Sequence, residues 1–524
     1  MPVLLVLVLA LACGHAQPTP VTQRSAPARR AGAAGDATLS AAAISEETRK
    51  LLVAEGELLW KRWTTGAGPM PASALADHPR LSQRESIEVV NGAAALATTP
   101  EDRGALSLLE QQLATFAIAR EASAEIDALE RARAQLAFAP PGQTAATSGE
   151  RDLDRLLTDE PNAQKRALIA LAEARAAQPL APLALARDAA VDKAIQAAGT
   201  GTWISLQERA HGMTMQELAQ LAEATLKATE EVGGRAVEAS AVRNLGITSD
   251  RLRRADLPRM ARTAIADPHF APGKAWPFLR DVLIKVGAPP PPSVRLDAEP
   301  SPSKGARPLA LLVDPPRDVR LSLRPAGGFE EQRSTLHEGA RAAGGAYTAV
   351  PRWELAQLGD GSASLGIALL FESLAGHPEW LRATTQLRGE PLDDLVHTEA
   401  TRRLLSARRN AAMVLFEIKR REGPQTPEAQ AALYRRLLQR ALFCALSDDD
   451  AGRWALEADS FTLTALEAAR AVGLANLDPA ALAAVADTRL KYSAPDAPPV
   501  APKPDYKYMQ GDKKKRRKAR KKTQ

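Results

Sequence analysis

Cysteine and aromatic residues are scarce in this chain of 524 residues. Its two cysteines, Cys13 and Cys444, give no basis for a disulfide scaffold, and the apolar helical pattern of residues 441–446 predicts that Cys444 is a buried thiol. With only 4% aromatic residues and abundant alanine, the composition favours packed helices over extended β structure. We therefore predict a mainly α protein with a large core.

Histidine is also scarce, and its spacing excludes one common metal motif. The seven histidines are His15, His78, His211, His269, His337, His377 and His397, and none has another four residues later. An HExxH zinc motif needs that spacing because residues i and i+4 share one helix face. In the sequence Leu-His-Glu-Gly-Ala-Arg at 336–341, Arg341 holds the position of the second histidine. A guanidinium has no available lone pair and stays charged, so Arg341 repels a dication.

Several segments around this motif follow the order of a known enzyme family. They are residues 319–328, 336–338, 358–374 and 378–381: a predicted strand, a Gly-Gly turn, a His-Glu helix and a helix entered through Gly-Asp. This order resembles the oligoendopeptidases, zinc peptidases related to thimet oligopeptidase. The resemblance is clearest over residues 297–420. It implies a mainly α, cleft-bearing gluzincin fold with a small β element.

The resemblance also implies where the site residues fall. His337 matches the first zinc ligand and Glu338 the catalytic glutamate, whereas Arg341 and Leu365 hold the positions of the other two ligands. Glu372 is expected about 10 Å beyond Leu365 along the same helix, too far to replace it. We therefore interpret His337 and Glu338 as vestiges of a zinc site and expect no cofactor. Zinc is expected only if the chain is an active peptidase. Arg341 is expected to pair with Glu338, three residues earlier on the helix.

The N-terminus predicts export. Residues 2–12 form an apolar run that is too short to span a bilayer but has the length of a signal-peptide core. Small residues before Cys13 predict a lipoprotein leader over 1–13, with Cys13 lipidated and 14–40 as a disordered tether. Because no Lys or Arg precedes the run, plain secretion and a misassigned start codon remain alternatives. We expect a periplasm-facing lipoprotein of the cell envelope, held by its lipid and not by a transmembrane span.

The C-terminus is a basic tail. Nine positive charges and no acid lie within residues 513–522, so the rest of the chain has a formal net charge of −3 instead of +6. Such a block is expected to be disordered and to bind anionic lipid or another polyanion without sequence specificity. A solubilising tail is the alternative. The cations are Lys513, Lys514, Lys515, Arg516, Arg517, Lys518, Arg520, Lys521 and Lys522.

By composition the chain divides into a helical N-terminal domain (41–288), a Pro-rich linker (289–306), a further helical domain (307–490) and a disordered tail (491–524). The resemblance implies that the domain at 307–490 is metallopeptidase-like. Helices are predicted over 44–65, 100–138, 150–177, 180–198, 214–232 and 255–265. Strands are predicted at 308–313 and 319–324. In the peptidase family, the strand that matches residues 319–324 is an edge strand that pairs with bound peptide. A structural hairpin is the alternative for this strand.

Arg408 and Arg409 are interpreted as structural partners of carboxylates, with an anion site as the alternative.

Three functions follow from these features. The first is a non-catalytic relative of the peptidases that binds peptide or protein segments in its cleft at the cell envelope. The second is an active peptidase of the oligoendopeptidase type with an atypical site. The third is a polyanion-binding envelope protein that acts through its basic tail.

Overall fold

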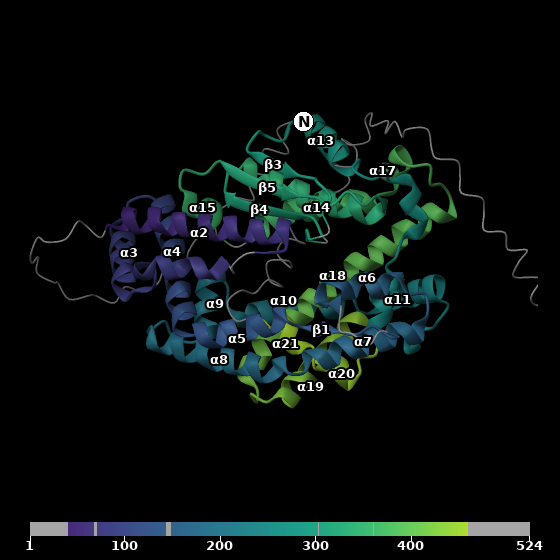
Figure 1. The fold of residues 1–524 in the computed structure, drawn as a ribbon, viewed down its shortest axis with the longest axis horizontal. Helices are drawn as coiled ribbons and strands as arrows, with labels where there is room; N and C mark the ends of the chain where they lie inside the picture. Colours follow the sequence, from purple (N-terminus) through teal and green to yellow (C-terminus); the bar gives the residue numbers. More distant parts are fainter. Residues whose placement is uncertain are drawn as a thin grey trace, which may run out of the picture. The chain divides into compact units, whose positions relative to one another are not determined.

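The computed structural model describes residues 40–67, 71–142, 148–301, 303–305, 307–359 and 361–458. These residues are mostly helical and confirm the predicted mainly α class (Figure 1). None of the described helices is long and apolar enough to cross a membrane. The predicted leader with Cys13, residues 14–39 of the tether, and the basic tail lie outside the described residues.

The first described helices form a hydrophobic cluster of their own. They are α2 (Ala41–Thr65), α3 (Arg84–Leu96) and α4 (Pro100–Glu121), with 3-10 turns η1 (Pro71–Asp77) and η2 (Pro79–Ser82). Helix α5 (Ser123–Ala134) follows, and its Leu129 belongs to another cluster. The helix predicted over 44–65 is present as α2, which begins earlier, at Ala41. The predicted start of α4 is confirmed, and Thr99 caps α4 by accepting a hydrogen bond from the Asp102 N–H. The single helix predicted over 100–138 is wrong. The chain leaves helical geometry at the buried Ala122, which lets α5 pack against α8.

Short helices continue through the middle of the chain. A two-residue hairpin, β1 (Ala137–Phe138) and β2 (Ser148–Gly149), precedes α6 (Glu150–Asp159), α7 (Ala163–Ala177), α8 (Leu180–Ala197), α9 (Trp203–His211), α10 (Met215–Ala228), α11 (Glu230–Leu245), η3 (Ser249–Arg251), η4 (Arg254–Asp256), α12 (Leu257–Met260), η5 (Ala264–His269) and α13 (Ala275–Lys285). The prediction for α8 is confirmed. The helix predicted over 150–177 breaks at Pro161, which lacks an N–H, and Asn162 caps α7. The helix predicted over 214–232 is also two helices, α10 and α11, and 255–265 forms only short turns.

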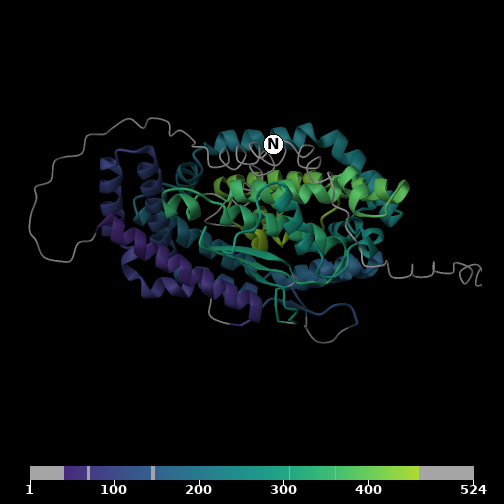
Figure 2. The ribbon, with the colours of Figure 1, turned by 90° about the horizontal axis from the view of Figure 1, so that it is seen from above.

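A small sheet lies between α2 and α14 (Gly328–Ala346) (Figures 1 and 2). It contains β3 (Val294–Asp297), β4 (Leu309–Asp314) and β5 (Asp318–Ser322) in the order β3-β5-β4, with β3 parallel and β4 antiparallel to β5. Val313 lies against Gly56 of α2, whereas Leu312 lies against Gly345 of α14. Because successive strand residues point to opposite faces, the two helices cover opposite faces of the sheet.

The two predicted strands are therefore confirmed, but the predicted edge strand is wrong. Residues 319–324 contribute β5, which is the central strand. The partner on its other side is β3, which comes from the Pro-rich stretch predicted as a linker. That stretch is also anchored at Lys304, whose buried ammonium contacts the Asp297 carboxylate at 2.9 Å. The described residues of this stretch, 289–301 and 303–305, are thus part of the folded body.

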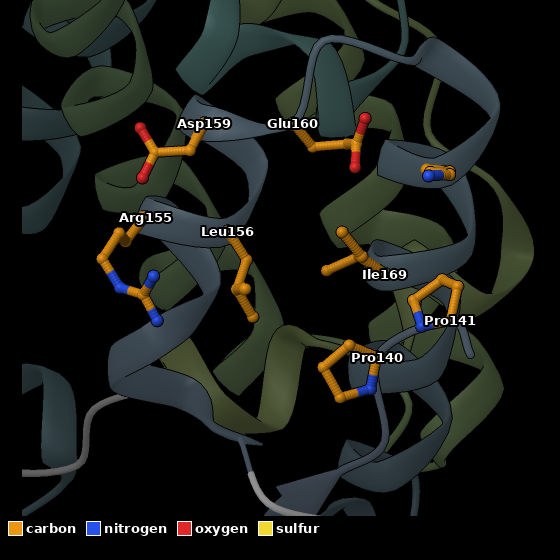
Figure 3. A pocket seen from close by; sticks show the side chains of 8 residues that line it. Pro140, Pro141, Arg155, Leu156, Asp159, Glu160 and Ile169 are labelled. Carbon is orange, nitrogen blue, oxygen red and sulfur yellow. The ribbon is translucent and has the colours of Figure 1, made fainter. Parts of the chain in front are cut away.

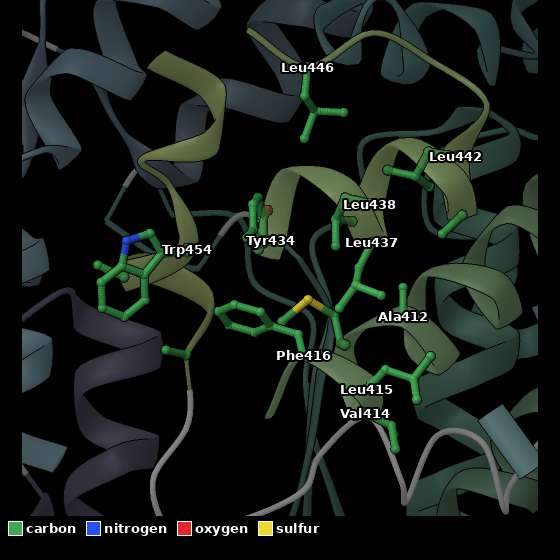
Figure 4. Packing of buried hydrophobic residues seen from close by; sticks show 14 of the residues in the cluster. Ala412, Val414, Leu415, Phe416, Tyr434, Leu437, Leu438, Leu442, Leu446 and Trp454 are labelled. Carbon is green, nitrogen blue, oxygen red and sulfur yellow. The ribbon is translucent and has the colours of Figure 1, made fainter. Parts of the chain in front are cut away.

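The C-terminal helices complete the largest core (Figure 4). Of these helices, α18 (Glu390–Glu422), α19 (Pro427–Leu442) and α21 (Trp454–Glu457) contribute to it. The other C-terminal elements are α15 (Trp353–Gln357), α16 (Ser362–Glu372), η6 (Ser373–Gly376), α17 (Pro378–Thr384) and α20 (Asp448–Ala451). Phe416 of α18 packs edge-on against Tyr434 of α19, with ring centroids 5.5 Å apart. Helices α10 and α11 also contact α18, so residues before and after the Pro-rich stretch share this core.

Two predictions about single residues in this core are confirmed. Arg408 is fully buried and donates to the backbone oxygens of Leu226, Arg440 and Ala441, while Arg409 pairs with Glu457. Both arginines are therefore structural. Cys444 is a buried free thiol, and its burial raises the pKa to about 12.

Candidate functional site

The candidate site lies on α14, the helix that carries His337 and Glu338. This helix starts after a Gly-Gly turn in which Gly327 and Gly328 have φ values of 80° and 86°, a region that favours glycine. The carboxylate of Asp267 then accepts a hydrogen bond from the Phe329 N–H at 3.0 Å, which satisfies one open donor at the helix start. The turn and the cap together fix where α14 begins and how it is rotated.

Glycines let α14 pack closely on three neighbours. A Cβ on Gly339 would come within 2.4 Å of Leu279 in α13, and one on Gly345 within 2.3 Å of Leu312 in β4. Gly344 similarly faces Ile367 of α16. One stripe of half-buried side chains remains open to solvent, and we call it the polar face of α14: Ser334, His337, Glu338 and Arg341.

His337 is held by a carboxylate from the neighbouring helix. Its Nδ1 lies 2.7 Å from Oε2 of Glu372, at the end of α16. The other oxygen of Glu372 accepts hydrogen bonds from Arg333 at 2.9 Å and from Arg402 of α18 at 2.5 Å. Glu372 is therefore the centre of a network that joins α14, α16 and α18.

This network explains the protonation state of Glu372. Burial acts to raise the pKa of its carboxyl group. The hydrogen bond from His337 and the charges of Arg402 and Arg333 outweigh burial, so the pKa lies well below its ordinary value. Glu372 is consequently a buried anion that already has three cationic or donor partners.

Glu338 faces the sheet. Its Oε2 accepts a hydrogen bond from the backbone N–H of Ala310 in β4 at 2.8 Å. The predicted pair with Arg341 is present, but the nitrogen and oxygen are 3.8 Å apart, which is too long for a hydrogen bond. The Nε of Arg341 is buried and makes no hydrogen bond with the residues that the structure describes. The guanidinium is thus held loosely beside Glu338.

The structure corrects the expectation about Glu372 and locates Leu365. The contacts His337–Glu372 and Gly344–Ile367 show that α14 and α16 run antiparallel. Leu365 therefore lies level with Gly345, about 12 Å along the axis from His337 at 1.5 Å per residue. Glu372, which the sequence placed too far away, is the acidic residue of α16 that contacts His337. Sequence spacing gives positions along one helix but not its register against another.

The polar face does not fit the zinc ion that the resemblance implies. Within the described ranges, no group of three or more His, Cys, Asp or Glu side chains is placed to hold a metal ion. The Nδ1 of His337 is engaged by Glu372, and its Nε2 is 3.8 Å from Oε1 of Glu338. Arg341 adds a positive charge at the same place. The donors present are one imidazole and one carboxylate that is already hydrogen-bonded, which is too few for zinc.

Sequence reasoning missed Arg333 and Arg402, which hold Glu372. Both lie in patterns that read locally as charged helix surface, and only the packing of α14 against α16 and α18 brings them together. The sequence matches no known family model, and no curated protein sequence matches it. The resemblance to oligoendopeptidases therefore rests on the motifs alone.

Proposed function

We propose that this protein is a non-catalytic relative of the oligoendopeptidases that binds peptide or protein segments. The observation that carries the proposal is the occupation of His337 and Glu338 by other partners. Glu372 engages His337, and Ala310 and Arg341 contact Glu338. A glutamate that activates water must be able to accept a proton from it. The Oε2 of Glu338 instead accepts a hydrogen bond from the backbone N–H of Ala310.

The polar face of α14 is the surface that we propose receives the peptide. It is half-buried, it offers donors and acceptors, and it borders β4, the strand that donates its Ala310 N–H to Glu338. Backbone amides of a peptide need such partners when they leave water. Arg341 adds a cation whose only carboxylate contact among the described residues is the long one to Glu338.

The test combines binding and turnover in one experiment. A library of fluorescent peptides is incubated with the full chain, followed by anisotropy and by mass spectrometry. We expect binding without cleavage, and a loss of affinity of about tenfold in Arg341→Glu because an attractive contact becomes repulsive. Arg84→Glu is the matched control, since Arg84 is exposed and pairs only with Glu88. Cleavage that disappears in His337→Ala would instead support the active-peptidase alternative.

The basic tail supports a second role. Its nine cations within residues 513–522 are the basis for proposing that it binds anionic lipid or another polyanion at the cell envelope. Removing residues 513–522 should abolish binding to anionic vesicles at low salt and leave peptide binding unchanged. Vesicle binding that survives the truncation would refute this role.

Lipidation of Cys13, which would place the chain at the envelope, is checked by fatty-acid labelling of the wild type and Cys13→Ser.

A further inference from the structure

A hollow of about 280 Å³ lies where α6 turns into α7, away from the polar face of α14. Its apolar walls are Leu156 and Ile169, which lie on either side of the opening in Figure 3, with Pro140 and Pro141 beside them. At about 30 Å³ per molecule it holds roughly nine waters. It is slightly smaller than the ~300–1,000 Å³ pockets that hold drug-sized ligands. Its occupant must therefore be small.

The hollow also has charged walls of both signs. Arg155, Asp159, Glu160 and Lys165 complete its lining, and Figure 3 shows the Asp159 and Glu160 carboxylates pointing in different directions, with Asp159 on the side of Arg155. Glu160 accepts a hydrogen bond from the Asn162 N–H at 2.8 Å. The side chains of Asp159 and Lys165, both exposed, make no hydrogen bond or ion pair with each other or with any other described residue. The hollow thus combines an anion and a cation that lack partners with apolar walls.

The frame around the hollow is rigid. Pro161 ends α6, and Asn162 caps α7 through the N–H groups of Gln164 and Lys165. The buried Arg166 donates to the backbone oxygens of Glu160 and Pro161, at 3.0 and 2.9 Å, and pairs with Asp256 at 2.7 Å. These contacts fix the corner between the two helices, so the backbone positions of Asp159 and Lys165 are set before any ligand arrives. Such preorganisation lowers the cost of binding.

We propose that this hollow binds a small zwitterion with an apolar group, of the size of an amino acid or a dipeptide. The ammonium of the ligand pairs with Asp159 and its carboxylate with Lys165. Its apolar side chain lies between Leu156 and Ile169. Both side chains are exposed, so a ligand that supplies an ammonium and a carboxylate pairs with them through charge-assisted hydrogen bonds, while its apolar group leaves water between the apolar walls.

The experiment is a calorimetric titration of the full chain with the dipeptide Leu-Leu. We expect binding that weakens about tenfold when the dipeptide is N-acetylated or C-amidated, because each change removes one charge-assisted contact. Asp159→Asn and Lys165→Gln should each weaken the binding of unmodified Leu-Leu by a similar factor. Asp154→Asn is the matched control: Asp154 lies on the same helix, pairs with Arg307 and does not line the hollow.

Two outcomes would overturn this proposal. One is the absence of any heat of binding up to about 10 mM dipeptide. The other is equal binding by the wild type and both charge variants. Arg341→Glu should leave dipeptide binding unchanged, so this result is independent of the function proposed for α14.

Discussion

The Nδ1 atom of His337 lies 2.7 Å from the Oε2 atom of Glu372. A metal-binding histidine commonly directs its second nitrogen at a carboxylate in this way, which orients the ring toward the metal. Here the orienting contact is present, while Arg341 holds the position that the resemblance gives to a second ligand. The same carboxylate is also shared with Arg333 and Arg402. The contacts of Glu372 with His337, Arg333 and Arg402 connect α14, α16 and α18.

Replacing Glu372 should therefore reduce stability in a pH-dependent way. Its folded-state pKa is depressed, so its contribution is present above the unfolded value of 4.5 and is lost as the pH falls below it. Glu372→Gln should lower the free energy of unfolding by about 3 kcal/mol at neutral pH, because it leaves half-buried guanidiniums without their anion. Urea denaturation at neutral pH and near pH 4 should show the difference shrinking in acid. Glu379→Gln, an exposed partner of Arg382, is the control.

Neighbouring arginines in α18 should differ sharply in importance. Arg408 is fully buried and bonds three backbone oxygens, whereas the side chain of Arg409 is 41% exposed. We expect Arg408→Lys to cost about 3 kcal/mol, since lysine cannot reproduce the planar fork and leaves buried carbonyls unpaired. Arg409→Lys should cost less than about 1 kcal/mol. Equal midpoints of denaturation for the two variants would contradict this assignment.

The thiol of Cys444 should be unreactive in the folded protein. Burial raises its pKa to about 12, so very little thiolate exists at neutral pH. In a Cys13→Ser background, which leaves Cys444 as the sole cysteine, a disulfide reagent should label the chain only after denaturation. Rapid labelling under native conditions would show that this part of the core opens readily.

Glu55 of α2 should destabilise the protein at alkaline pH. Burial raises its pKa to about 7, and it makes no hydrogen bond or ion pair with any described residue. Because the folded-state pKa is raised, the stability that it contributes is full below pH 4.5 and is lost as the pH rises through about 7. Glu55→Gln should therefore melt at a higher temperature than the wild type near pH 8 and at a similar temperature near pH 4. Glu88→Gln, at an exposed position, should change neither value.

Local signals in the sequence predicted local structure well. Thr99 and Pro100 marked the start of α4, and the alternation of apolar and polar residues marked β5. The errors came from features set by distant contacts. A buried break at Ala122 has no cap signal, and β3 lies among prolines that indicate a linker. Whether β5 is central or at an edge depends on β3, which pairs with it from a part of the chain more than 20 residues away.

The predictions for the candidate site show the same difference between local and distant features. The sequence identified His337, Glu338 and Arg341, which share one helix and therefore have a known spacing. It misplaced Glu372 because the register of α16 against α14 is set by glycine contacts such as Gly344 with Ile367. It missed Arg333 and Arg402 because their partner is on another helix. Cys13 and the basic tail lie outside the described residues, and the roles given to them stay predictions.

The metal content of the purified full chain tests the central claim most directly. The protein is dialysed against micromolar zinc, and bound metal is measured by mass spectrometry for the wild type and His337→Ala. We predict no bound zinc that is lost in His337→Ala, because Glu372 contacts the imidazole and Arg341 holds the position of a second ligand. One zinc ion per chain that is lost in His337→Ala would contradict the account.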